Sequence, residues 1–204
     1  MRENNIQDDK RSLLIEAAIK RFSHFGISKT TLSEIAEDVH ISKANLYYYF
    51  PDKWALIEAI VDEMISKSQA DFQTFLQNSP NVEHALSCIL ESKMEYLQKY
   101  RLLIRNLNEV NVHETRFKAL SERLFEVERQ MIATVLERGI KNEEIETIDV
   151  KEVSKLYTTA MRGLAMYRIY SDPSPIVDEA SIQMVSQQQH LLNRIICSGI
   201  KKHN

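Results

Sequence analysis

Residues 31–53 read TLSEIAEDVHISKANLYYYFPDK, and this stretch predicts two short helices joined by a tight turn. The first helix begins with a capping box, because Thr31 can cap the backbone N–H of Glu34 while the Glu34 side chain reaches back. Its apolar residues recur at i, i+3, i+4 and i+7, so one face of this helix is buried. Ser42 is a strong N-cap residue for the second helix, which buries Leu46. The pattern is a helix-turn-helix.

The outward face of the second helix carries side chains suited to reading DNA. A lysine can donate to guanine acceptors and an asparagine can bridge an adenine edge, which assigns Lys43 and Asn45 to the major groove. Three consecutive tyrosines cannot all be buried on one helix. We therefore expect Tyr48 to pack against the first helix, and Tyr47 and Tyr49 to reach phosphates or thymine methyl groups.

Residues near the helix N-termini favour phosphate contacts, because free backbone N–H groups there attract anions. Lys29 and Lys53 gather around the second helix, and Lys53 can clamp one phosphate. Thr31 is first a cap, so Thr30 is the freer threonine for a phosphate contact. The predicted DNA-binding residues are Lys29, Thr30, Thr31, Ser42, Lys43, Ala44, Asn45, Tyr47, Tyr49 and Lys53.

The spacing of these residues resembles the N-terminal domain of the TetR family of bacterial transcriptional regulators. The resemblance covers about residues 13–56 and rests on Ile35, Ala36, Val39, Ile41, Ser42, Leu46, Tyr47, Tyr48, Tyr49, Phe50, Lys53 and Leu56. Lys53 matches the lysine that binds phosphate in that family. Two positions depart from the family pattern: His40 replaces the usual glycine of the turn, and Trp54 stands where relatives often carry an acidic residue. The turn requires a left-handed backbone, in which histidine is enriched among non-glycine residues.

Composition predicts an all-α protein and excludes several enzyme classes. Among 204 residues only four glycines and four prolines interrupt long helical patterns, and no phosphate-binding glycine loop can be written with them. No apolar run approaches the ~18 residues of a membrane span. Neither a zinc motif nor a pair of Glu-x-x-His motifs occurs, so we expect no metal and no cofactor. The net charge of −3 decides nothing, because DNA binding needs only a local basic surface.

Helical periodicity predicts a three-helix DNA-binding head in residues 1–54 and a larger helical bundle in residues 55–204. Helices are expected at about 9–25, 32–39, 43–49, 53–77, 82–100, 101–110, 114–139, 150–171 and 176–201. Asp172-Pro173-Ser174-Pro175 is the strongest break in the chain.

The larger domain has many bulky or pliable residues on its core-facing sides. Such stripes are more often plain core, but bundles also build ligand sites between facing helices, and methionines suit an adaptable pocket. The resemblance implies an effector-binding and dimerisation domain. The candidate ligand-binding residues are Phe72, Met94, Asn111, His113, Phe117, Tyr157 and Met161.

The last helix carries an apolar seam that could join two copies of the chain. The candidate dimer residues are Ile182, Val185, Gln189, Leu192 and Ile196. Together with the 150–171 helix, this seam makes half of an intermolecular four-helix bundle. A two-fold dimer presents its recognition helices about one DNA turn (~34 Å) apart, which predicts a palindromic operator.

The sequence therefore indicates a cytoplasmic, homodimeric transcriptional regulator, most simply a repressor, that is not an enzyme. Its partners are double-stranded operator DNA and a small-molecule effector, with no membrane. Two alternatives stay open. A helical enzyme predicts turnover of a small molecule, and a ligand-independent DNA-binding protein predicts little sequence preference.

Overall fold

The computed structural model describes residues 2–100, 102–103, 106, 115–171 and 179–202, without the side chains of 2–8 and 168–171. Its helices are α1 (Arg2–Phe25), α2 (Leu32–Asp38), α3 (Lys43–Tyr49), α4 (Lys53–Asn78), α5 (Val82–Lys99), α7 (Thr115–Lys141), α8 (Val150–Ser171) and α9 (Glu179–Ile200). Over these described residues the only β-type pairing is an isolated bridge between Ile145 and Lys201, which confirms the all-α class. The predicted helix at 101–110 lies mostly outside the described residues.

The chain divides into two compact units. The first unit comprises Met1–Ser66 and Tyr100–Phe117, and the second comprises Lys67–Lys99 and Lys118–Asn204. The continuous helix α4 contributes its beginning to the first unit and its end to the second. This division differs from the predicted head of residues 1–54, because it also includes the start of α4 and a later segment. Compactness does not define a functional domain, so the boundary at residue 54 stays a prediction.

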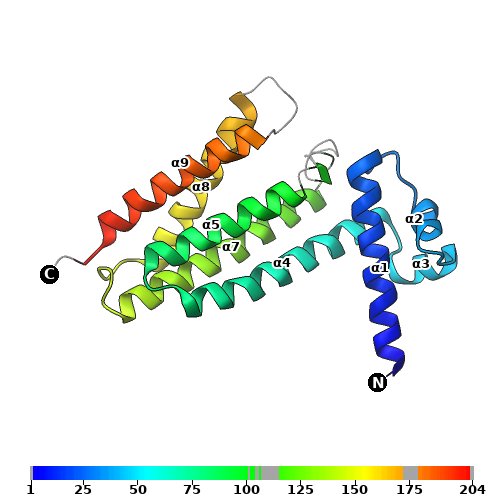
Figure 1. The fold of residues 1–204 in the computed structure, drawn as a ribbon, viewed down its shortest axis with the longest axis horizontal. Helices are drawn as coiled ribbons and strands as arrows, with labels where there is room; N and C mark the ends of the chain where they lie inside the picture. Colours follow the sequence, from blue (N-terminus) through cyan, green and yellow to red (C-terminus); the bar gives the residue numbers. More distant parts are fainter. Residues whose placement is uncertain (1, 101, 104–105, 107–114, 172–178, 203–204) are drawn as a thin grey trace. The chain divides into compact units, whose positions relative to one another are not determined.

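The first unit is built on α1, with α2 packed against α1 and α3 packed against α2 (Figure 1, blue to cyan). The core side chains Leu14, Phe22, Ile35, Leu46 and Leu56 are all fully buried. α1 ends where Gly26 adopts a positive φ of 83° and its N–H reaches the Phe22 carbonyl at 3.2 Å. A glycine at this position is the usual way to end a helix.

The second unit is a helical bundle in which α9 packs against both α5 and α8 (Figure 1). Hydrogen bonds add further links: Lys93 on α5 donates to Glu128 on α7 at 2.6 Å. The buried core of this unit comprises Phe72, Val82, Ala85, Leu86, Ile89, Leu90, Met131, Ile132, Val135, Leu136, Ile145, Tyr157, Met161 and Cys197. No helix in the described part of the chain is long and apolar enough to cross a membrane.

Candidate nucleic-acid interface

α2 is fixed in place by its own cap and by an arginine from α1. Thr31 Oγ1 accepts from the Glu34 N–H at 3.2 Å while Glu34 Oε2 accepts from the Thr31 N–H at 2.7 Å, which confirms the predicted capping box. Arg21 donates to both carboxylate oxygens of Asp38, at 2.6 and 2.8 Å, and pairs with Glu34 at 3.2 Å. These hydrogen bonds from Arg21 lower the pKa of Asp38, whereas the Thr31 hydrogen bonds are the main cause of the lowered pKa of Glu34.

The role of Arg21 in this arrangement was not predicted from the sequence. A signal was present, because Glu34 and Asp38 stand four residues apart and therefore project from one face of α2. Two neighbouring carboxylates on a helix repel each other unless a cation lies between them. The forked guanidinium of arginine suits that position better than the point charge of lysine.

The turn between α2 and α3 is a Schellman motif with histidine at the left-handed position. His40 has a φ of 55°, its N–H donates to the Glu37 carbonyl at 3.1 Å, and the Ile41 N–H donates to the Ala36 carbonyl at 2.9 Å. The left-handed backbone expected at His40 is confirmed. Because a side chain at this φ is strained by about 1 kcal/mol, the turn is held by the packing of the two helices it joins.

α3 begins at a capped N-terminus and anchors itself by one apolar side. Ser42 Oγ accepts from the Asn45 N–H at 3.2 Å, and Leu46 is fully buried. Lys43 is exposed, and its ammonium lies 5.8 Å from the ring centroid of Tyr47, one turn along the same helix. Tyr47 is 44% exposed. α3 therefore presents an exposed cation and an exposed aromatic ring from a capped backbone, while the predicted base-reading residue Asn45 is half-buried.

The tyrosines of α3 are arranged differently from the prediction. Tyr48, expected to pack on the first helix, is 73% exposed, and Tyr49, assigned to DNA, is half-buried with its ring edge-on to Tyr48 at 5.3 Å. The reason is helical geometry: at about 100° per residue, Tyr48 lies roughly 200° from the buried Leu46, whereas Tyr49 lies only about 60° from it. Tyr47 and Tyr48 are the outward pair.

The predicted phosphate ligands fall into two groups. Lys29 and Thr31 are exposed, as a phosphate contact requires. Thr30 is 1% exposed and donates to the Gly26 carbonyl at 2.8 Å, so its hydroxyl closes the turn and is not the freer one. Lys53 donates to the carbonyls of Ile27 at 2.9 Å and Ser28 at 3.3 Å. Its ammonium therefore braces the same turn at the position where a phosphate contact was predicted.

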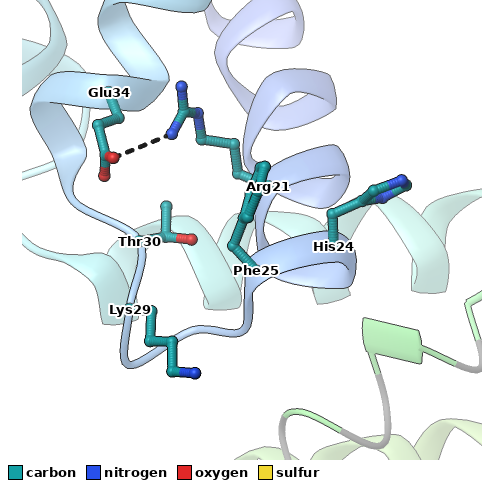
Figure 2. A pocket seen from close by; sticks show the side chains of 6 residues that line it. All are labelled: Arg21, His24, Phe25, Lys29, Thr30 and Glu34. Atoms are coloured by element: carbon teal, nitrogen blue, oxygen red, sulfur yellow. Dashed lines mark ion pairs between the residues drawn. The ribbon is translucent and has the colours of Figure 1, made fainter.

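A surface hollow lies beside this turn, between the end of α1 and the start of α2 (Figure 2). It is lined by Arg21, His24, Phe25, Lys29, Thr30 and Glu34. Phe25 is 59% exposed, and the Arg21 guanidinium lies 5.6 Å from its ring centroid. Arg21 is paired with Asp38 and Glu34. Lys29 is therefore the lysine or arginine lining this hollow that has no acidic partner among the residues described here.

The candidate ligand-binding residues lie in different parts of the structure. Phe72, Tyr157 and Met161 all belong to the buried core of the second unit, and Met94 is buried in the same unit outside that cluster. Phe117 is half-buried in the first unit, apart from the residues with which it was grouped. Asn111 and His113 lie outside the described residues.

The predicted dimer seam points into its own protomer. Ile182, Val185 and Gln189 are buried within the second unit, and Leu192 and Ile196 pack against its core. α9 also carries a second apolar stripe, Met184, Leu191 and Ile195, that is 44–59% exposed. Among the described side chains of α8, the exposed large apolar ones are Leu156, Met166 and Tyr167. Sequence periodicity detected the buried stripe and missed the exposed one, because both repeat at helical spacing.

Within the described residues no group of three or more His, Cys, Asp or Glu side chains could hold a metal ion.

The family model described as bacterial regulatory proteins, tetR family, matches residues 14–60. The chain is 28% identical to the uncharacterized HTH-type transcriptional regulator YhgD of Bacillus subtilis, over 69% of this chain and 74% of YhgD. It is 33% identical to the HTH-type transcriptional regulator RutR of Escherichia coli, over 46% of this chain and 45% of RutR.

A solved structure shares the fold over almost the whole chain. The transcriptional regulator from Cytophaga hutchinsonii superposes with a TM-score of 0.81 at 25% identity, over 95% of this chain and 99% of that protein. These similar proteins are transcriptional regulators, which contradicts the enzyme alternative.

Proposed function

We propose that this chain, which belongs to the TetR family of bacterial transcriptional regulators, is a ligand-responsive repressor that binds a palindromic operator as a homodimer. The observation that carries the DNA-binding part is the outer face of α3. Lys43, Tyr47 and Tyr48 are exposed there, on a helix fixed by the Ser42 cap and by the buried Leu46. A short helix held this rigidly can enter the major groove without losing its orientation.

Base reading is assigned to Lys43 and Asn45 at the N-terminal end of α3. Their side chains match guanine acceptors and an adenine edge respectively. Tyr48 joins Tyr47 as an aromatic contact, and Tyr49 supports the pair from the half-buried side. Lys29 supplies an exposed cation for a phosphate, and Lys53 holds the turn that presents Lys29 while retaining one ammonium N–H for a phosphate of its own.

Dimerisation is assigned to the exposed apolar stripe of α9 and the exposed apolar residues of α8. Met184, Leu191 and Ile195 follow spacings of seven and four residues, and a Cβ added at Gly199, four residues further, would meet no atom within 4 Å. Such a stripe is costly to leave in water and suits a two-fold, self-complementary helix bundle. The domain boundary after residue 54 fits this scheme, with dimerisation and effector binding in residues 55–204.

The effector is assigned to the core of the second unit, around Phe72, Tyr157 and Met161. α4 is one continuous helix that belongs to both units, so a shift of its second half reaches the head. A displacement of a few Å between the two heads of a dimer prevents simultaneous docking on one operator. A modest difference in effector affinity between the two states is then enough to release DNA.

Operator selection followed by salt titration tests the proposal. The dimer should select a palindrome, and Asn45→Ala should lose about 1–3 kcal/mol of discrimination at one or two base positions. Asn142→Ala, the same change at an exposed site of the second unit, is the matched control and should select the wild-type motif. Binding without sequence preference at any salt concentration would favour the ligand-independent alternative.

A further inference from the structure

Two fully buried amides lie one turn apart on α9, and only one of them is saturated with hydrogen bonds. Asn193 Oδ1 accepts from the Tyr157 hydroxyl at 3.0 Å, and Asn193 Nδ2 donates to the Glu83 carbonyl at 3.2 Å and to Ser87 Oγ at 3.0 Å. Gln189 Nε2 donates to the Met161 carbonyl at 2.7 Å, while Gln189 Oε1 is buried and has no hydrogen-bond partner within the described part of the chain.

The orientation of the Gln189 amide is fixed by this contact. Turning the amide over would place Oε1 against the Met161 carbonyl, so that two acceptors would face each other. Nε2 is therefore the atom bound to the Met161 carbonyl, and Oε1 is the buried atom left without a donor. A buried acceptor without a donor destabilises the fold, and a native protein that keeps one requires a reason for it.

The residues of α5 one and two turns beyond Ser87 are apolar and buried. The pairs Tyr157–Asn193 and Met161–Gln189 show that α8 and α9 run antiparallel. Leu90 follows Ser87 by one turn on α5 and is 1% exposed. Met94, one further turn along, is 7% exposed, and Met161 is fully buried. Flexible thioether side chains can move aside for an apolar guest more easily than branched ones can.

We propose that Gln189 Oε1 is the acceptor that recognises a neutral, largely apolar ligand carrying one O–H or N–H donor. The donor satisfies the buried oxygen, and the apolar body displaces the methionine side chains. An anionic ligand is disfavoured, because it would bring a second negative atom towards Oε1. This inference rests on the proposed effector site in the second unit and names the chemical class of its ligand.

The test uses pairs of probes that differ in one donor: indole with 1-methylindole, and 1-naphthol with 1-methoxynaphthalene. Affinities are measured on the full chain by ligand-observed NMR and by thermal shift. The donor-bearing member of each pair should bind about tenfold more tightly, the gain expected from one hydrogen bond to a buried acceptor. The added methyl group also changes size, so the comparison is repeated in Gln189→Met and Gln189→Leu, where the preference should disappear.

Gln187→Met is the matched control, because Gln187 lies on the exposed side of the same helix. It should keep the wild-type preference. The inference is overturned if neither probe pair binds, if both members bind the wild type equally, or if the preference survives in the Gln189 variants. Operator binding is measured on the same samples. Wild-type protein that binds operator but shows no donor preference refutes this inference alone, whereas wild-type protein without operator binding refutes the proposed function.

Discussion

Replacing Ile195 by glutamate should separate two copies of the chain without unfolding either one. Ile195 is 59% exposed in the protomer and lies on the exposed apolar stripe of α9, roughly 40° around the helix from Leu191. Val185 lies roughly 80° around the helix from Ile195, on the side opposite to Leu191, and is only 7% exposed. The two positions therefore distinguish a surface between copies from the core of a single copy.

The size of the effect follows from the burial. Complete burial of an isoleucine contributes about 1.5–3 kcal/mol, so the exposed part of Ile195 contributes about 1–1.5 kcal/mol when a partner covers it. Two-fold symmetry doubles this to about 2–3 kcal/mol, and each 1.4 kcal/mol is a factor of ten in affinity. Ile195→Glu should thus weaken the dimer by about 100-fold, before adding the cost of two unpaired carboxylates.

Val185→Glu should behave differently, because it buries a carboxylate inside the protomer. The expected loss of about 3–5 kcal/mol is a large part of the 5–15 kcal/mol that holds a typical domain together. We expect a strongly lowered melting temperature at every protein concentration. Gln183→Glu, on an exposed side of α9 away from both stripes, is the control and should leave both properties unchanged.

Sedimentation velocity over a range of concentrations, circular-dichroism melting and operator titration are measured on all three variants. Ile195→Glu should sediment as a folded monomer and lose operator affinity although α3 is untouched. The reasoning is refuted if Ile195→Glu sediments as a dimer at concentrations where the wild type begins to dissociate.

Three other changes probe the head. Lys53→Ala should weaken binding about equally on all DNA sequences and reduce the slope of log affinity against log salt concentration by about one. It should also lower the melting temperature, because the Lys53 ammonium braces the turn. An unchanged salt slope would show that Lys53 has a structural role only. His40→Gly should raise the free energy of unfolding by about 1 kcal/mol in urea denaturation, because glycine adopts the φ of 55° without strain. A loss of stability would contradict the inference that His40 is strained. Asp38 has a lowered pKa through its hydrogen bonds with Arg21, so its contribution to head stability is present above about pH 4 and is lost as the pH falls through the lowered pKa. In acid titrations followed by circular dichroism, Arg21→Gln should remove that contribution, and identical curves for both proteins would exclude it.

The sequence was sufficient for features that depend on neighbouring residues. The capping box at Thr31, the Ser42 cap and the left-handed His40 each follow from residues within a few positions of one another, and the structure confirms all three. For the described helices the bounds were predicted to within about three residues for the same reason, since helical hydrogen bonds join residues four apart. The exception is α1, which was expected from about residue 9 and begins at Arg2. Because glycine and proline are scarce, few positions interrupt helices, and the all-α class followed from composition.

Only the tertiary structure decided which face of each helix turns inward. Apolar periodicity shows that a helix has a buried side, but α9 carries two apolar stripes, and the sequence does not say which one meets its own protomer. The prediction for Tyr48 was wrong for the same reason. Thr30 and Lys53 donate hydrogen bonds to the backbone carbonyls of Gly26 and Ile27 and so close the turn after α1. Lys53 and Ile27 are 26 residues apart in the sequence and are brought together by packing, which acts through space and leaves no local pattern.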